Sequence, residues 1–347
     1  MSLSQVRSTL ARLTLLAWVA LFVGQSILSC QERVPVRAPI VVVPPPRTGF
    51  PRIVLVAPES EQVTTLTRTL RSELGADFDV ADVTISPQTT SNELKRILAE
   101  LAPRATVLVD NSAVQLYAPI AEASKNPLPS LIVMASFAEE LQRRTPNSMA
   151  IAFETPVVTT LSDLRALLGR PLARAGVVYR AGFESFVNRE RERAARSQIE
   201  LVLVRVPSAP SVGSLSRALR KLERAHLDAV WISNDNVLLT RRLLGRAWIP
   251  FEKKTGLPIV VGVPGLVRSP IPFATYAAVP DPVGLGVQAA DLIFSLRDSD
   301  FRVTTPGVQP PIAVKTYLNA ERGRSLGMPP ESETRVDVLL HPGGPNP

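Results

Sequence analysis

Residues Ile53–Leu74 read IVLVAPESEQVTTLTRTLRSEL. Five consecutive apolar residues, Ile53–Ala57, are followed by a polar loop, and Val63–Leu74 then carries apolar residues at helical spacing. A short, continuous apolar run predicts a strand buried on both faces, and the segment after it predicts an amphipathic helix. This strand and helix are half of a βαβ unit and favour a parallel sheet.

The same alternation continues along the chain and begins again near residue 149. Further strands are predicted at Val80–Ile85, Thr106–Val109, Leu131–Met134, Met149–Phe153, Arg174–Tyr179, Glu200–Val206, Ala229–Ile232 and Pro258–Val261. Helices are predicted at Ser91–Leu101, Ala113–Ser124, Thr159–Leu168, Phe183–Ser197, Ser214–Ala225 and Leu238–Thr255. Phe273–Val279, a helix at Pro282–Leu296 and Ile312–Leu318 complete the pattern. The sequence therefore predicts an α/β fold of two doubly wound, Rossmann-like lobes with a ligand cleft between them.

The N-terminus has the pattern of an export signal over residues 1–29. Arg7 and Arg12 precede the apolar run Leu13–Val23, and a small residue stands before Cys30. The run is shorter than the roughly 20 apolar residues that span a bilayer. Cys30 in this setting resembles the lipobox cysteine of bacterial lipoproteins, which implies a diacylglyceryl group and acyl chains such as palmitate on its thiol. The alternatives are a signal peptide that happens to end in cysteine and an uncleaved membrane anchor.

Two segments are predicted to lie outside the folded lobes. Residues 31–49, QERVPVRAPIVVVPPPRTG, are rich in proline and valine. Proline favours an extended chain of about 3.1 Å per residue, so residues 30–49 are predicted to form a lipid-anchored tether. Residues 331–347 contain Gly-Gly and proline and are predicted to form a flexible tail.

Composition argues against most catalytic chemistry. Cys30 is the only cysteine, so disulfides, thiolate nucleophiles and cysteine-ligated metals are not expected once it is lipidated. The two histidines, His226 and His341, lie in a helical pattern and in the tail, which suits neither a metal site nor a serine triad. With no G-x-G-x-x-G or P-loop motif either, we expect a protein that is not an enzyme and needs no metal or cofactor.

The positive charge does not indicate a nucleic-acid partner. The net charge is +8, of which Arg7 and Arg12 would leave with the signal. The other basic residues are spread along predicted helices, and in Arg189–Arg196, RERERAAR, they alternate with glutamates as on a solvated helix face. This charge favours solubility and attraction to anionic lipid headgroups rather than binding to nucleic acid.

Four segments resemble one family in the same order along the chain. They are Tyr179-x4-Glu184-Ser185, Ser233–Val237 (SNDNV), Phe273–Leu292 (FATYAAVPDPVGLGVQAADL) and Val314–Pro329 (VKTYLNAERGRSLGMP). Together they resemble ABC-transporter substrate-binding proteins with the type 1 periplasmic-binding fold, in the branch that includes transporters proposed for aromatic amino acids.

This resemblance implies a chain that crosses between its lobes three times. Lobe one would comprise residues 50–150 plus 273–298, and lobe two residues 151–272 plus 299–330. Three hinge crossovers allow the lobes to close around a ligand.

The first lobe supplies four candidate ligand-binding residues. Asn111 and Ser112 follow a predicted strand at the start of a helix, where a hydroxyl or amide beside free N–H groups suits a ligand carboxylate, although either could be a plain N-cap. Ser136 follows the next strand and is an equivalent candidate. Asp281 stands near a crossover, and Asp-Pro is also an ordinary helix start.

The second lobe supplies three more. Glu184 could receive a ligand amine or complement a helix dipole. Asp235 and Asn236 end a predicted strand, where an aspartate could pair with a ligand ammonium group or form an Asx turn.

Two functions remain in competition at this stage. The first is a membrane-tethered receptor on the periplasmic face of the cell envelope that captures a small ligand, of the amino-acid type, for an ABC permease. The second is an envelope lipoprotein that uses the same fold as a protein-interaction or regulatory module. The second is favoured by two loops that depart from the family, Ala57-Pro58-Glu59-Ser60 and Ser269-Pro270-Ile271-Pro272.

Overall fold

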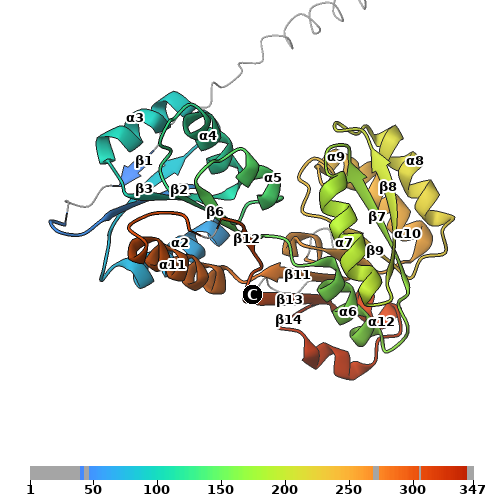
Figure 1. Ribbon diagram of the computed structural model, residues 1–347. Helices are drawn as coiled ribbons and strands as arrows, with labels where there is room; N and C mark the ends of the chain where they lie inside the picture. The colour runs from blue at the N-terminus through green and yellow to red at the C-terminus, as the bar shows by residue number, and fades with distance from the viewer. Residues whose placement is uncertain (1–39, 43–46, 269–272, 305, 342–347) are drawn as a thin grey trace, which may run out of the picture. The chain divides into compact units, whose positions relative to one another are not determined.

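The computed structural model describes residues 40–42, 47–268, 273–304 and 306–341, with the side chains of 40–42 excepted (Figure 1). The predicted signal segment and Cys30 therefore lie outside the described residues. Within the described part, no helix combines the length and the apolar character needed to cross a membrane.

The first lobe is built on a seven-stranded sheet in the order β1-β3-β2-β4-β5-β6-β12. Its strands are β1 (Ile40–Val42), β2 (Arg52–Pro58), β3 (Asp79–Ile85), β4 (Ala105–Val109), β5 (Ser130–Val133), β6 (Ser148–Ile151) and β12 (Val308–Gln309). All neighbours pair in parallel except β1 and β3. The alternation of apolar runs and amphipathic helices predicts a parallel sheet, and the structure has one.

Helices cover both faces of this sheet (Figure 1). They are α2 (Glu61–Leu74) and α11 (Pro282–Asp298) on one face, and α3 (Ser91–Leu101), α4 (Asp110–Glu122) and α5 (Ala138–Arg143) on the other. Two separate apolar clusters, one on each side of the strands, form the core of the lobe.

The second lobe is built on another seven-stranded sheet, in the order β14-β13-β11-β10-β9-β7-β8. Its strands are β7 (Arg174–Arg180), β8 (Glu200–Val206), β9 (Ala229–Ile232), β10 (Ile259–Val261), β11 (Tyr276–Pro280), β13 (Val314–Asn319) and β14 (Val338–Leu340). Only β11 and β13 pair antiparallel.

Helices pack on both faces of this sheet as well. One face carries α6 (Val157–Leu168), α7 (Glu184–Arg196) and α12 (Ala320–Ser325). The other carries α8 (Val212–Glu223), α9 (Arg241–Leu243), the π-helical turn η1 (Leu244–Trp248) and α10 (Ile249–Thr255). Short 3₁₀ turns lie at η2 (Pro264–Leu266) and η3 (Pro330–Arg335). The α/β fold of two doubly wound lobes is confirmed.

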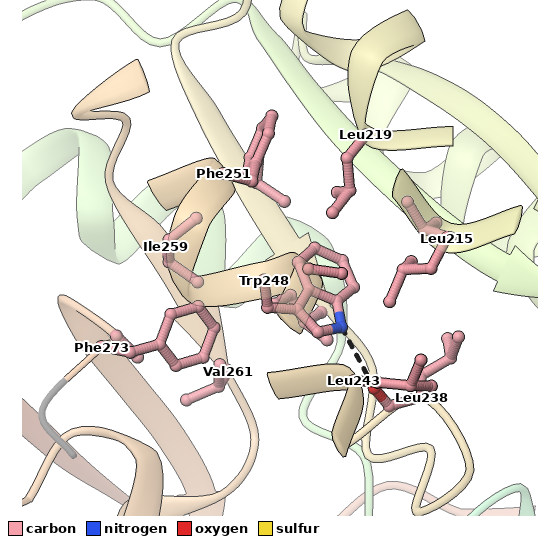
Figure 2. Packing of buried hydrophobic residues seen from close by; sticks show 14 of the residues in the cluster. Leu215, Leu219, Leu238, Leu243, Trp248, Phe251, Ile259, Val261 and Phe273 are labelled. Carbon is pink, nitrogen blue, oxygen red and sulfur yellow. Dashed lines mark hydrogen bonds between the residues drawn. The ribbon is translucent and has the colours of Figure 1, made fainter. Parts of the chain in front are cut away.

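Trp248 lies at the centre of the second lobe's larger core (Figure 2). Its side chain is fully buried among leucines of α8 and apolar residues of β10, and its indole N–H donates to the carbonyl of Leu238 at 3.1 Å. A buried tryptophan needs a partner for this N–H, and here the turn before α9 supplies it.

The chain crosses between the lobes at residues 152–156, at Asp281 and at residues 310–313. Backbone hydrogen bonds join the crossovers, from Ala152 N to Gln309 O at 2.8 Å and from Asp281 N to Ala313 O at 3.0 Å. The buried side chain of Gln288 on α11 donates to Pro310 O at 3.0 Å and accepts from Ile312 N at 3.2 Å. The predicted three crossovers are confirmed, and together they form a single hinge.

The predicted lobe boundaries are wrong for two strands. β11 lies in the predicted lobe one but belongs to the second sheet, whereas residues 308–309, which are not predicted to be a strand, lie in the predicted lobe two and pair as β12 with β6 in the first sheet. The chain therefore crosses after β11 and again after β12. Apolar periodicity identifies β11 as a strand but does not say which sheet provides its hydrogen-bonding partners, and β12, with two residues, is too short to show a periodic pattern.

The predicted tether and tail are also shorter than expected. Within the tether, β1 pairs with β3 at the sheet edge, and the Arg47 guanidinium hydrogen-bonds to the carbonyls of Gly75 and Phe78. Within the tail, β14 pairs with β13, and the buried Ser332 hydroxyl donates to Leu167 O at 2.6 Å. Backbone pairing and burial thus fix segments whose composition suggested extended chain; residues 342–347 lie outside the described residues.

Close packing of α11 on α2 depends on Gly286. A Cβ atom built there would lie 2.7 Å from the Cβ of Thr69 and 3.1 Å from the backbone oxygen of Leu66. We predict that Gly286→Ala lowers the free energy of unfolding by about 1–3 kcal/mol, because overpacking forces the helices apart. Urea unfolding followed by circular dichroism measures the change.

Gly245 in η1 is the matched control, since a Cβ there meets nothing within 4 Å. Gly245→Ala is expected to leave stability unchanged or to raise it by up to about 1 kcal/mol through helix propensity. Equal effects of the two substitutions would contradict the packing role of Gly286.

Candidate functional site

A cavity of about 360 Å³ lies beside the hinge, and we refer to it as the hinge cavity. Both lobes and two of the three crossovers contribute to its wall. The lining residues are Phe137, Ala138, Glu139, Glu140, Ala152, Glu154, Pro156, Val158, Thr159, Phe186, Arg189, Glu190, Arg193, Val308, Gln309 and Pro310. Its volume lies at the small end of the range for small-molecule sites.

Aromatic side chains from the two lobes meet at this cavity. Phe137, at the start of α5, lies with its ring centroid 4.1 Å from that of Phe183 and 5.2 Å from that of Phe186, the second pair at 89°. Phe186 in turn lies 6.3 Å from Trp231 on β9. Tilted and edge-to-face contacts of this kind stabilise the approach of one lobe to the other.

Phe137 is held in place from two sides. Its φ of 58° is left-handed and therefore unfavourable for a bulky residue. The Asn111 side chain accepts from Ser136 N at 2.8 Å and donates to Ser136 O at 3.0 Å, while the Glu154 carboxylate accepts from Phe137 N at 2.6 Å. These three hydrogen bonds fix the loop that aims the ring at lobe two.

Charged side chains line the rest of the cavity in pairs. Arg189 on α7 forms an ion pair with Glu139 on α5, which links the lobes. Arg193 pairs with Glu190 at 2.7 Å, and the other oxygen of Glu190 accepts from Val157 N at 2.8 Å. Among the described residues, no group of three or more potential ligands is placed to hold a metal ion.

Glu154 differs from the other carboxylates of the cavity. It lies in the crossover at residues 152–156, only 8% of its surface is exposed, and no lysine or arginine among the described residues pairs with it. Burial raises its pKa to about 7, opposed by hydrogen bonds from the backbone of Phe137 and of Glu154 itself, with further upward contributions from Glu190 and Glu139. Burial therefore keeps this carboxyl close to half protonated at neutral pH.

Of the candidates predicted in lobe one, the structure brings Asn111 and Ser136 together. They bond to each other beside Phe137, as described above. Ser112 lies within the first turn of α4, which begins at Asp110 rather than at Ala113, and its hydroxyl donates to the Asp110 carboxylate at 2.8 Å. Asp281 caps α11 by accepting from Gly284 N at 2.8 Å. None of the four lines the hinge cavity.

The candidates predicted in lobe two are occupied by internal partners. Asp235 is buried, pairs with Arg180 at 2.6 Å and accepts from Val237 N at 2.9 Å, as in an Asx turn. Glu184 pairs with Arg205 at 2.7 Å, and hydrogen bonds from its own backbone and from Gly182 lower its pKa. Asn236 is exposed. A ligand role for these residues stays a prediction.

Comparison with solved structures identifies the fold. A substrate-binding protein with adhesive properties from Clostridium difficile, in its ligand-free, open form, aligns with a TM-score of 0.60 at 12% identity over 84% of this chain and 100% of its own. An ABC domain from Streptococcus pneumonia in complex with L-Trp aligns at 0.54 with 14% identity, over 83% and 99%. A conserved domain protein from Vibrio cholerae aligns at 0.59 with 16% identity, over 84% and 99%.

The chain has the type 1 periplasmic-binding fold. No family model matches the sequence, and no curated protein matches it. The hinge cavity is lined by both lobes of this fold and by the crossovers that connect them.

Sequence reasoning missed Phe137, Glu154, Phe186 and Arg189. Phe137 and Glu154 lie in the segments that follow β5 and β6, and Phe186 and Arg189 lie on α7, but no local pattern in the sequence shows that these four side chains meet. One signal was present: Phe183 and Phe186 are the only large aromatic residues in an otherwise strongly charged helical segment. An apolar ring on a charged helix marks a contact face.

The raised pKa of Glu154 predicts how stability depends on pH. An ordinary glutamate in the unfolded chain titrates near 4.5, while folded Glu154 titrates at about 7, so the folded state binds the proton more tightly. Its contribution is therefore fully present below pH 4.5 and is lost as the pH rises through 7. We predict that wild type loses on the order of 3 kcal/mol more stability between pH 4.5 and pH 8 than Glu154→Gln, which keeps an acceptor for Phe137 N. Chemical unfolding at both pH values measures this difference, and identical pH profiles would contradict it.

Proposed function

We propose that this chain is a lipid-tethered solute-binding protein that captures a small ligand between its lobes and hands it to an ABC permease. The observation that carries the proposal is the hinge cavity, whose wall takes residues from lobe one, lobe two and two crossovers. A ligand that contacts both lobes has different affinities for the open and closed arrangements, and only such a ligand shifts the population between them. The work is binding and closure, with no covalent step.

The fold supports this function because a substrate-binding protein and an ABC domain in complex with L-Trp share it. The Streptococcus protein holds L-Trp, an amino acid, which is the ligand type that the sequence resemblance implies. We propose a permease as the partner, a location at the cell envelope on the periplasmic face, and no nucleic-acid partner. A ligand-binding role for Asn111 and Ser136 stays a prediction; in the structure, Asn111 binds the backbone of Ser136 in the loop that carries Phe137.

Cys30 is proposed as the lipid anchor. Cys30→Ser should abolish incorporation of labelled palmitate and move the protein from the detergent phase to the aqueous phase in a phase-partition assay, because stable anchoring needs two or more acyl chains. Ser29→Ala, next to it, should keep the label. Labelling of the Cys30→Ser protein would contradict the anchor while leaving solute binding untouched.

Ligand capture is tested by combining a thermal-shift screen with small-angle scattering. The screen covers amino acids, amines, alcohols and carboxylates, and a ligand at 100 times its Kd should stabilise the folded protein by about 2.7 kcal/mol. A compound that raises the melting temperature should also reduce the radius of gyration. We predict that Phe137→Ala weakens binding at least about tenfold, because the ring forms part of the cavity wall and bridges the lobes. A binding compound that leaves the radius of gyration unchanged would contradict closure.

The second candidate function is a protein-interaction or regulatory module. It is favoured by the contacts that already join the lobes without any ligand, namely the Phe137–Phe183 and Phe137–Phe186 ring pairs and the Glu139–Arg189 ion pair. For this function, Phe137→Ala combined with Arg189→Gln should disrupt partner capture in cells, while no compound in the screen shifts the melting temperature.

A further inference from the structure

The charges of the hinge cavity do not balance. Four glutamates line it, namely Glu139, Glu140, Glu154 and Glu190, against two arginines. Three of the glutamates each have an arginine: Arg189 for Glu139, Arg143 for Glu140 at 2.6 Å and Arg193 for Glu190 at 2.7 Å. The remaining carboxylate, Glu154, is therefore the point in the described lining where a positive charge is missing.

The position of Glu154 suits a ligand rather than a simple structural role. A buried carboxylate without a cationic partner is costly, and a purely structural acceptor for Phe137 N could be an amide or a carbonyl. Glu154 instead places an ionisable group on a crossover, against the cavity and next to the Phe137 ring. Phe186 adds a second ring, and Ala152, Pro156 and Pro310 give apolar walls.

We propose that the hinge cavity binds a small organic cation, an amine with a compact apolar or aromatic body and no carboxylate, with Glu154 as its counter-ion. This proposal rests on the proposed function and narrows its ligand class. The ammonium group donates a charge-assisted hydrogen bond to Glu154. The rings of Phe137 and Phe186 contact the body of the ligand and offer their faces to the cation.

The same lining disfavours an amino acid. A ligand carboxylate needs a cation or free N–H groups, and Arg189 and Arg193, the two cations of the described lining, are both committed to glutamates. Bringing a carboxylate close to Glu154, Glu190 and Glu139 also adds like-charge repulsion. The ligand class inferred here therefore differs from the amino-acid ligand that the sequence resemblance implies.

Binding should depend on pH in a defined direction. The groups that face Glu154 are Glu139 and Glu140 from α5, and Arg189, Glu190 and Arg193 from α7. An ammonium ligand binds the ionised carboxylate, and a proton competes for the same site. With the Glu154 pKa at about 7 in the empty cavity, affinity for the amine should fall about tenfold from pH 8 to pH 6. A neutral ligand would show no such loss.

The experiment compares matched compounds on the purified full chain by isothermal titration calorimetry. One series is phenethylamine, phenylalanine and 2-phenylethanol, and the other is isopentylamine, leucine and isopentanol. Within each series the body is kept, while the charge changes from cation to zwitterion to neutral. The expected result is that an amine binds at least about tenfold more tightly than its amino acid and its alcohol.

Two variants locate the site. Glu154→Gln keeps the acceptor for Phe137 N and removes the charge, so amine affinity should fall at least about tenfold. Glu100→Gln makes the same change at an exposed carboxylate of α3 that pairs with Arg96 at 3.0 Å and does not line the cavity, and amine affinity should change less than about threefold. If Glu154→Gln does not fold, the pH dependence of the wild type decides the question.

The outcomes separate this inference from the proposed function. If phenylalanine, leucine or an alcohol binds as tightly as the amine, the ligand class is overturned while solute capture stands. Amine binding that is unaffected by Glu154→Gln, or that does not weaken between pH 8 and pH 6, overturns the role of Glu154. If none of the compounds here or in the thermal-shift screen binds, both the ligand class and solute capture fail.

Discussion

The structure depends on one constraint: three crossovers must run side by side so that two separately folded sheets share a single hinge. Gln288 enforces this from α11 through its two hydrogen bonds to the third crossover, and the Ala152–Gln309 and Asp281–Ala313 bonds join the crossovers to one another. Each lobe has its own apolar cores on both faces of its sheet and is therefore a stable unit. The narrow connection between the two lobes can act as a hinge. A ligand in the cavity can stabilise one arrangement of the lobes over another, because residues on both sides of the hinge form the cavity wall.

Two residues with strained backbone lie beside this hinge. Met134 and Phe137 both adopt left-handed φ, at 57° and 58°, in the loop after β5. Strained residues of this kind persist only where the surroundings over-determine them. Here the surroundings are Asn111, which binds both backbone groups of Ser136, and Glu154, which binds Phe137 N. Glu154 thus has two roles, holding the aromatic ring in place and presenting a charge to the cavity, and the two are coupled through one carboxylate.

The sequence predicted the two-lobed fold well because apolar runs such as Ile53–Ala57 leave little choice of element. It failed where pairing depends on the rest of the fold: β11 is predicted as a strand but its sheet is not, and the two-residue β12 is not predicted at all, because its partner β6 lies far away in sequence. For the site, the sequence placed Asn111 and Ser136 near the correct loop. Glu154 could not be found this way, because its burial depends on Phe137, 17 residues earlier, and on α7 of the other lobe.

The magnitudes of the interlobe contacts bear on which function the fold can serve. An ion pair between partly exposed side chains, as for Glu139 and Arg189, contributes at most about 1 kcal/mol. An aromatic pair such as Phe137–Phe183 adds roughly 0.5–1.5 kcal/mol beyond its buried area. With a second aromatic pair, Phe137–Phe186, these contacts bias the lobes toward each other by a factor of roughly tens to hundreds, whereas moving an equilibrium from 1:99 to 99:1 takes about 5.5 kcal/mol. A ligand of ordinary affinity that contacts both lobes therefore has the free energy to control the hinge. A rigid interaction surface would need more interlobe contact than these three pairs provide, which is why the solute-binding function is the stronger of the two.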